Sequence, residues 1–534
     1  MTNQHFSKEL DHHGIIATVC DEIGLVDLID CIIPRDKQAD MTYGEATKLM
    51  IINGTGFNSR ALYLAAQFFD NKPLKRLLGR EIDADRVTDD TLGRALDALY
   101  EAGCNQIFAT IALNATKHFR VSRRIYHGDS SSFHVDGEYN REDNIGLVQF
   151  GHSKDHRPDL KQFMTHLIVS NDGGVPLFAE VIPGNTSDQT HFREVLKHLK
   201  EAIDPNEPAY YVADSALYTE ETIQETSHML WVTRVPERIK SAKEVVRNVP
   251  LEAMTPMGDG YYVSELGSWY GGVKQRWLLI FSEQAMARER ETLQRNIAKT
   301  YELERKALKK VIAQPYGCSK DAERALSAFS KKLKYHQLVG VEVSEQHMKE
   351  GRGRPKKGEP VNLQYKIAAS LEIDPTKVEA VLSEKGKFII ATNQLDTQEL
   401  SSLDLLQTYK DQQHVERGFK FLKDPAFMTS SIFLKKESRI VAMGMIMCLS
   451  LLVYTLAQRL LRQKLASLDL TIPNQHGKRT QRPTMRWIFQ MFEGIQVLYV
   501  RGSSSEIILN LNDVRETVLS AMGPAYQARY RNVA

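Results

Sequence analysis

The segment between residues 121 and 235 constrains the fold most, because its apolar pattern changes there from helical to strand-like spacing. The expected elements are, in order, strands at 125–135, 162–170 and 175–182, a helix from 188 to 199, a strand at 210–213, a helix at 220–226 and a strand at 230–235. The second and third strands are joined by Asn171-Asp172-Gly173-Gly174, residue types that tight hairpins with positive φ prefer. The segment therefore predicts an α/β domain that opens with three antiparallel strands.

Two aspartates occupy related places in this pattern. Asp129 lies in the first expected strand, and Asp214 follows the end of the fourth. The order of elements is that of the ribonuclease H-like fold, in which the first and fourth strands are neighbours. We therefore expect Asp129 and Asp214 to meet at one edge of the sheet. The helix that closes this fold does not follow the fifth strand directly, because residues 236–384 intervene.

A third acidic residue, Glu416, lies in the segment YKDQQHVERGFKFLK, which runs from Tyr409 to Lys423. At about 100° per residue, a helix over this segment presents its polar side chains on one face beside an apolar stripe. The residues on that polar face are Tyr409, Gln412, Glu416 and Lys423. An ordinary amphipathic helix with a solvated charged stripe has the same pattern. Glu416 becomes a candidate for function only if Asp129 and Asp214 lie beside it.

Three carboxylates at one edge of a sheet repel one another unless a cation neutralises them. Mg²⁺ prefers hard oxygen ligands and retains water and substrate phosphate in its coordination shell. Two Mg²⁺ ions, with Mn²⁺ as an alternative, would bridge one phosphate and support an in-line displacement. Asp129, Asp214 and Glu416 together therefore predict phosphodiester chemistry. Lys423 is a candidate to hold an adjacent phosphate, and Tyr409 a candidate to donate to or stack on the strand.

Other residues near the first strand compete for these roles. Asp136 and Glu138 follow Asp129, but Asp136 is seven residues on, so an undistorted strand directs it to the opposite face about 23 Å away. His127 and His134 have no second histidine at a metal-ligand spacing, and packing or surface positions are the favoured interpretation. Asp129 is the preferred ligand.

Composition indicates a multidomain globular chain. The 534 residues carry a formal charge of only +2, so any basic surface for nucleic acid must be local. The five cysteines contain no C-x-x-C pair, which argues against zinc modules and disulfide frameworks and favours a reducing, cytoplasmic location. Residues 440–457 carry no charge and reach the lower limit for a membrane span, but a buried helix is the favoured interpretation. We expect no membrane association.

These patterns predict a helical N-terminal domain at 1–120, for binding DNA ends or dimerisation. The ribonuclease H-like core is expected in two parts, at 121–235 and, with the Glu416 helix, at 385–463. A mixed α/β insertion at 236–384 separates the two parts, and a C-terminal tail follows at 464–534. The insertion should contain a helical hairpin split near Pro315 and Gly317. Its aromatic residues Trp269, Tyr270 and Trp277 could stack a flipped base, although ordinary buried or interface positions are favoured.

The sharpest basic feature is GRGRPKKG, from Gly351 to Gly358. An Arg-Gly-Arg-Pro core flanked by lysines resembles the AT-hook type of arm that inserts arginine into a narrow minor groove. The residues concerned are Arg352, Arg354, Lys356 and Lys357. We favour DNA contact over a solvated linker.

The motifs also resemble a known family. YKDQQHVERGFKFLK has the Y-x2-R-x3-E-x6-K spacing of insertion-sequence transposases of the DDE class, and HGDSSSFHV, VADSALYT, GHSKDHRPDLKQF and PGNTSD look like segments of its IS-sixteen-thirty-four branch. The resemblance covers nearly the whole chain, and its motifs are specific jointly rather than singly. It implies that Asp129, Asp214 and Glu416 are the metal-binding triad.

The resemblance implies further roles. Tyr409 and Lys423 would contact DNA, as would Lys154 and Arg157 in the loop before the second strand. Gln412 occupies the arginine position of the signature, and a neutral amide cannot make the charge-assisted phosphate contact. Gln412 is therefore expected to contact DNA through a neutral amide.

The implied reaction is hydrolysis at the ends of an element, followed by attack of the freed 3′-hydroxyls on target DNA. The partners would be element ends and target DNA, held by a homodimer in a synaptic complex in the bacterial or archaeal cytoplasm at the nucleoid. Two alternatives stay open: a structure-selective nuclease of the same fold, and a non-catalytic DNA-binding descendant of a transposase.

Overall fold

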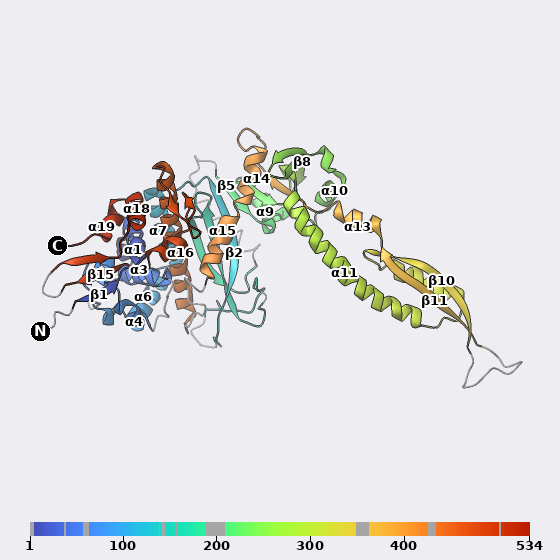
Figure 1. Ribbon diagram of the computed structural model, residues 1–534, viewed down its shortest axis with the longest axis horizontal. Helices are drawn as coiled ribbons and strands as arrows, with labels where there is room; N and C mark the ends of the chain where they lie inside the picture. Colours follow the sequence, from blue (N-terminus) through green and yellow to red (C-terminus); the bar gives the residue numbers. More distant parts are fainter. Residues whose placement is uncertain are drawn as a thin grey trace. The chain divides into compact units, whose positions relative to one another are not determined.

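The computed structural model describes the chain in ranges, which are 5–36, 39–56, 64–137, 139, 145–155, 157–187, 209–348, 362–424, 434–500 and 504–533. The expected helix at 188–199, Glu138 and the GRGRPKKG arm with Arg352, Arg354, Lys356 and Lys357 lie outside these residues. The chain divides into two compact units (Figure 1). Unit 1 comprises 1–233, 270–273 and 392–534, and unit 2 comprises 234–269 and 274–391.

Unit 1 contains a mixed sheet whose strands neighbour one another in the order β4-β3-β2-β5-β6. Its strands are β2 (Ile125–His134), β3 (Gln162–Ser170), β4 (Pro176–Pro183), β5 (Tyr210–Ala213) and β6 (Leu230–Arg234). The pairs β2–β3 and β3–β4 are antiparallel, whereas β2–β5 and β5–β6 are parallel. Each strand lies within one or two residues of its expected bounds. The predicted mixed α/β class is confirmed, and the first and fourth strands of the pattern are neighbours.

The N-terminal part of unit 1 is helical, as expected. Its helices include α1 (His13–Glu22), α2 (Leu25–Ile32), α3 (Tyr43–Gly54), α4 (Ala65–Asp70), α5 (Leu74–Leu78), α6 (Asp89–Glu101) and α7 (Cys104–His118). Thr42 caps α3 by accepting from the Glu45 backbone N–H at 3.1 Å, and the Glu45 carboxylate accepts from the Thr42 N–H at 2.8 Å. This reciprocal capping box is a local signal that sequence alone reveals.

The two ends of the chain fold together. An antiparallel sheet has the order β1-β15-β16, formed by β1 (Phe6–Glu9), β15 (Gln496–Tyr499) and β16 (Glu506–Leu509). The buried Arg76 side chain donates to the Glu506 carboxylate at 2.5 Å and to two backbone carbonyls near the C-terminus. The remaining C-terminal elements are β13 (Ile472–Pro473), β14 (Arg479–Thr480), α17 (Met485–Phe492), α18 (Asp513–Met522) and α19 (Pro524–Arg529). Residues 464–534, expected as a tail, thus contribute to the core around α1.

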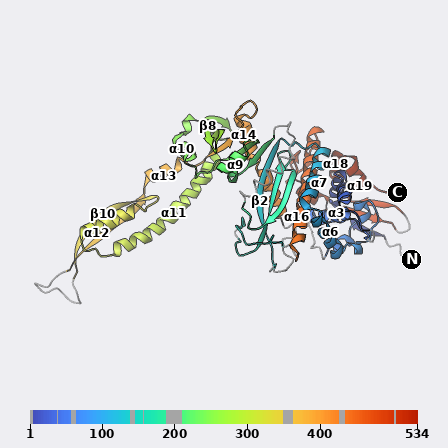
Figure 2. The same cartoon turned by 180° about the vertical axis from the view of Figure 1, so that it is seen from behind.

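The helix α16 (Glu437–Ser467) is the central element of unit 1. It contacts the N-terminal helices α1, α3, α6 and α7 and strand β4, and Figure 2 shows it between helices α3 and α6 and the sheet that contains β2. It is long and apolar enough to cross a membrane, but 83% of its most apolar window is buried inside the protein. The predicted buried helix at 440–457 is therefore the core of α16.

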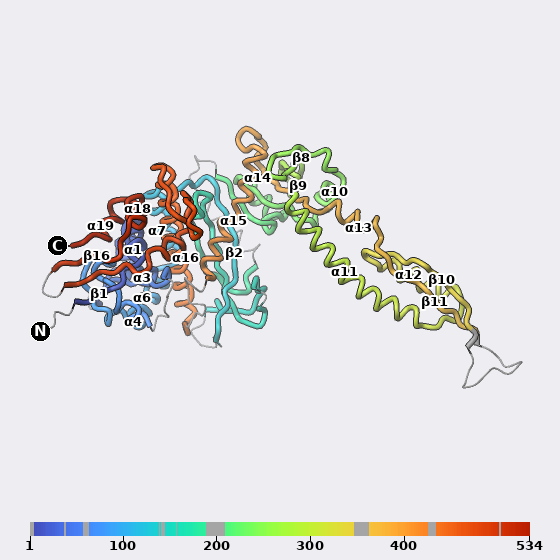
Figure 3. The backbone as a smooth tube through the Cα atoms, viewed as in Figure 1, coloured from blue at the N-terminus to red at the C-terminus, as the bar shows by residue number. Residues whose placement is uncertain are grey.

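Unit 2 has its own strands, in the order β12-β9-β8-β7, and a long hairpin of β10 and β11 (Figure 3). The strands are β7 (Thr255–Gly258), β8 (Tyr261–Tyr270), β9 (Val273–Ser282), β10 (His336–Met348), β11 (Asn362–Ile373) and β12 (Lys387–Thr392). The helices are α10 (Lys240–Asn248), α11 (Glu283–Ala313), α12 (Ser319–Ser330) and α13 (Pro375–Leu382). Helices α11 and α12 are the two expected amphipathic helices, and both pack on β11.

The aromatic residues of the insertion differ from one another. Trp277 is only 2% exposed, which agrees with the expected buried position, whereas the Trp269 side chain is 71% exposed. Tyr270, which belongs to unit 1, stacks on Tyr218 with ring centroids 4.7 Å apart. Trp269 is therefore the one of these three that packing does not account for.

Candidate active site

The sheet register brings Asp129 and Asp214 to the same level. On the parallel strands β2 and β5, Tyr126 pairs with Tyr211 and His127 pairs with Val212. Asp129 and Asp214 each lie two residues beyond the pair His127 and Val212, and Asp214 directly follows the end of β5. The Asp214 carboxylate caps the short 3₁₀ helix Ser215–Leu217 by accepting from the Ala216 N–H at 2.9 Å.

Both carboxylates also affect the pKa of a buried tyrosine, Tyr211. The Tyr211 hydroxyl lies over Gly128, where an added Cβ would be 1.7 Å from it, so only glycine fits. Burial raises the pKa of Tyr211 well above its usual value, and the charges of Asp129 and Asp214 raise it further. The phenol and the two carboxylates therefore share one electrostatic environment.

Helix α15 (Gln413–Leu422) carries Glu416 and packs on β2 and β3. Gln412, at its N-cap, donates to the Gly128 carbonyl at 3.0 Å and contacts His127 Nδ1 at 3.2 Å through its amide oxygen. At the other end of the helix, the Lys423 ammonium lies 5.4 Å from the Phe133 ring centroid. The helix thus runs along β2 in the same direction as the strand.

The contacts of Gln412 and Lys423 with β2 limit where Glu416 lies along the strand. It lies four helical residues beyond Gln412, about 6 Å along the axis, while Asp129 lies two strand residues beyond His127, about 6.6 Å. Alternation places Asp129 on the same face as His127. Gly418 is also in contact with Leu167, the cross-strand partner of Asp129. Helix α15 thus packs on the part of β2 and β3 that contains Asp129 and Leu167, and Glu416 itself is exposed.

The expected continuous helix from Tyr409 to Lys423 is wrong. Helix α14 (Ser402–Lys410) ends before a tight turn at Asp411 and Gln412, and α15 begins after it. Backbone bonds in the turn join residues three apart, from Gln412 N to Tyr409 O and from His414 N to Asp411 O. Tyr409 is thus half-buried on a different helix from Glu416. The helical spacing could not reveal this break, because it depends on the contacts of Gln412 with β2.

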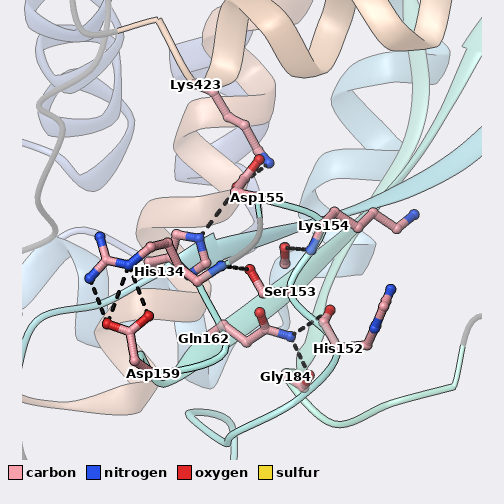
Figure 4. Close-up of polar contacts among 11 residues, drawn as sticks. His134, His152, Ser153, Lys154, Asp155, Asp159, Gln162, Gly184 and Lys423 are labelled. Carbon is pink, nitrogen blue, oxygen red and sulfur yellow. Dashed lines mark hydrogen bonds and ion pairs between the residues drawn. The ribbon is translucent and has the colours of Figure 1, made fainter. Parts of the chain in front are cut away.

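The loop before β3 lies beside these residues. The Lys154 ammonium donates to Ser130 O at 2.5 Å and to Ser130 Oγ at 3.2 Å, and it lies 3.5 Å from Asp129 Oδ1. The adjacent Asp155 pairs with Lys423 at 2.7 Å (Figure 4). Arg157 is exposed, and its guanidinium group donates to both oxygens of the Asp159 carboxylate. Lys154 thus reaches the proposed site, whereas Arg157 is engaged within the loop.

The donor set of the candidate site consists of carboxylate oxygens, which fits a hard divalent cation such as Mg²⁺. Asp214 and Glu416 are exposed, and the Asp129 side chain is 30% exposed. Within the part of the chain that the structure describes, no group of three His, Cys, Asp or Glu side chains is close enough to hold a metal ion. The structure therefore brings the two aspartates and α15 together without forming a closed three-ligand cluster.

Sequence reasoning missed the roles of His127, Asn171 and Asp155. His127 is buried and bridges Gln412 and Asn171, which agrees with the expected packing position. The role of Asp155 could not be predicted, because nothing in the neighbouring sequence distinguishes it from other acidic loop residues. Its only signal was its place next to Lys154 in the segment GHSKDHRPDLKQF.

A test of the α15 anchor is the Gln412→Leu variant. Leucine removes the hydrogen bonds to Gly128 and His127, so we expect the free energy of unfolding to fall by about 1–3 kcal/mol. DNA cleavage should fall by roughly tenfold because Glu416 loses its position relative to Asp129. Thermal melts and cleavage rates check this. Gln413→Leu, at the exposed neighbour, is the control, and equal behaviour of the two variants would contradict the anchor.

Comparison with known families identifies the class of protein. The family described as "Transposase DDE domain" matches residues 123–453, more than half of the chain. The chain therefore belongs to the DDE-domain transposases. Residues 5–113 match a family described as "Domain of unknown function (DUF4277)".

Comparison with curated proteins found no match. Among solved structures, the chain is similar to a piggyBac transposase in a synaptic complex with hairpin DNA, studied by cryo-electron microscopy. The identity is 9% and the TM-score 0.37, with 92% of this chain and 82% of the other covered.

Proposed function

We propose that this transposase cleaves DNA at the ends of an insertion sequence and joins the freed ends to target DNA, on a ribonuclease H-like core. In cleavage, a water oxygen forms a bond to the phosphorus while the bond to the 3′ oxygen breaks, leaving a 3′-hydroxyl and a 5′-phosphate. In joining, that 3′-hydroxyl attacks a target phosphodiester and displaces its 3′ oxygen. Cleavage consumes one water and one phosphodiester, and joining forms one phosphodiester for each one that it breaks.

The observation that carries this proposal is that the β2–β5 register places Asp129 beside Asp214, and that the Gln412 contacts hold α15, the helix of Glu416, against β2. These three residues would hold Mg²⁺ or Mn²⁺, which when bound would neutralise charge on the scissile phosphate. Lys154 lies on the same side and, as a cation, favours approach of a phosphate.

The proposed DNA contacts are Tyr409, Lys423, Lys154 and Arg157, together with the arm residues Arg352, Arg354, Lys356 and Lys357. The hydrogen bonds of Gln412 to β2 favour a positioning role for it instead of a DNA contact. We further propose membership of the IS-sixteen-thirty-four branch with its Y-R-E-K signature, a homodimer that holds two element ends, and action in the cytoplasm.

The test is to incubate purified protein with DNA that carries the flanking ends of its own element, in Mg²⁺ or EDTA. Nicking and joining that require Mg²⁺ are the expected result. Cleavage without joining would favour a structure-selective nuclease, and binding without cleavage would favour a non-catalytic descendant. Cleavage by strictly monomeric protein on unpaired ends would contradict the homodimer.

A further inference from the structure

Two adjacent loop residues form ion pairs with two different residues of the candidate active site. Lys154 directs its ammonium group to Asp129 and Ser130, while Asp155 directs its carboxylate to Lys423. The first of these is a cation on a proposed metal ligand. The second is an anion on a proposed phosphate-binding lysine. The Lys154 ammonium group thus has the charge sign of a metal cation, and the Asp155 carboxylate has that of a DNA phosphate.

We propose that the dipeptide Lys154-Asp155 is an internal competitor for both ligands, with the ammonium group competing with a divalent cation for Asp129 and the carboxylate competing with a DNA phosphate for Lys423. This inference rests on the proposed function and adds a regulation of the same site. Metal and DNA each have to break one ion pair of the loop, and release of either half loosens the other because the two residues are adjacent.

The contacts of Lys154 support its half of the proposal. Among the described residues, its ammonium group lies near the carbonyl oxygen of Ser130 at 2.5 Å, the Ser130 hydroxyl at 3.2 Å and one carboxylate oxygen of Asp129 at 3.5 Å. The Lys154 backbone N–H donates to Ser132 Oγ at 3.1 Å, which ties the loop to β2. An oxygen-lined position that accepts an ammonium group is also one that a hard cation would take.

The contacts of Asp155 support the other half. One oxygen of its carboxylate lies 2.7 Å from Lys423 Nζ and 3.5 Å from His134 Nε2. An oxyanion held between a lysine and a histidine has the surroundings of a DNA phosphate oxygen. Lys423 is also held over the Phe133 ring, so its ammonium group is oriented before DNA binds.

The loop is built to hold both side chains in place (Figure 4). Ser153 Oγ accepts from the Arg157 backbone N–H at 3.0 Å. Gln162 donates to His152 O at 3.2 Å and to Gly184 O at 2.8 Å, which fixes the start of the loop to β3 and to the end of β4. The ion pairs themselves are accessible, since the four side chains are between 27% and 41% exposed. Ligands can therefore reach and replace them.

The metal half is tested by titrating Mn²⁺ alone, with free Mn²⁺ followed by electron paramagnetic resonance. Lys154→Met should lower the Mn²⁺ Kd about two- to fivefold, the range expected when a partly exposed ion pair is removed. Lys154→Arg keeps the cation and should retain the wild-type Kd. Lys464→Met, at an exposed lysine of α16, is the charge control. Unchanged or weaker Mn²⁺ binding by Lys154→Met would overturn the proposal.

The DNA half is tested by fluorescence anisotropy with an end-bearing duplex in EDTA. Asp155→Asn should lower the DNA Kd about two- to fivefold at low salt, with a smaller effect at higher salt. Asp155→Glu should behave as wild type, and Glu516→Gln on the exposed face of α18 is the charge control. Weaker DNA binding by Asp155→Asn would make Asp155 a group that orients Lys423 for DNA, and that result or an unchanged Kd would overturn the proposal.

The two levels of failure are distinguishable. Wild-type protein that cleaves its element ends, with variants that leave both Kd values unchanged, overturns only the competition by the loop. Wild-type protein that binds neither Mn²⁺ nor DNA, or Asp129→Asn protein that binds Mn²⁺ as tightly as wild type, overturns the proposed function and this inference with it. Thermal melts of all variants establish that each one is folded.

Discussion

Asp129→Asn protein is expected to lose at least about 10³-fold in the rate of Mg²⁺-dependent cleavage while it still folds and binds DNA. The amide keeps the size of the side chain but removes the negative charge that would hold the cation. Asp214→Asn and Glu416→Gln should each have an effect of the same order, because the three carboxylates would act on one phosphate. The measurement is single-turnover cleavage of end-bearing DNA, with circular dichroism and DNA binding recorded for each variant.

The matched control is Asp136→Asn. Asp136 lies beyond the end of β2 and is exposed, and the level of Asp129 and Asp214 gives it no part in the site. It should cleave at the wild-type rate. Full cleavage by Asp129→Asn together with loss in Asp136→Asn would mean that the register assigns the wrong carboxylate.

Glu437→Ala protein is expected to be less stable than wild type by about 3–5 kcal/mol. The Glu437 carboxylate is buried at the start of α16 and accepts three backbone N–H groups, from Ile145 at 2.8 Å, Leu147 at 2.9 Å and Val148 at 3.0 Å. Alanine leaves these donors without an acceptor, and an unsatisfied buried group, as at Leu147 and Val148, costs about 1–3 kcal/mol. Urea denaturation of the full chain measures the loss.

Two variants make this prediction specific. Glu437→Gln keeps one carbonyl oxygen as an acceptor, so its loss should be smaller than that of Glu437→Ala. Lys435→Ala, at an exposed position two residues earlier, should remain within about 0.5 kcal/mol of wild type. Equal stability of Glu437→Ala and wild type would show that the segment before β3 finds other acceptors.

Local patterns were sufficient for the strands that carry the aspartates. The alternation and hairpin residues predicted β3 and β5 at the bounds observed, and β2 within one residue. Chain order then predicted that β2 and β5 are neighbours, because a parallel crossover returns to the same sheet. The placing of Asp129 beside Asp214 follows from these two steps. The strand β10, by contrast, was not predicted, because its partner β11 begins beyond the GRGRPKKG segment and their pairing is not a local signal.

The segment around Glu416 shows where periodicity fails. Tyr409 and Glu416 have the spacing of one helical face, yet a turn separates their helices. The Gln412 side chain reaches His127 and Gly128, which are more than 280 residues away in the chain. A single-helix pattern contains no information about such a partner, so the break and the contacts of Gln412 came only from the structure.

The sequence by itself determined the strand order, the helical character of the N-terminal region and the neighbouring positions of Asp129 and Asp214, because spacing, caps and turn residues act over a few positions. The tertiary structure decided what depends on residues far apart in the chain. It joined the C-terminal strands to β1, broke the helix at Gln412, and set Lys154 and Asp155 against Asp129 and Lys423. These contacts are selected by long-range packing and charge, which only the folded chain brings together.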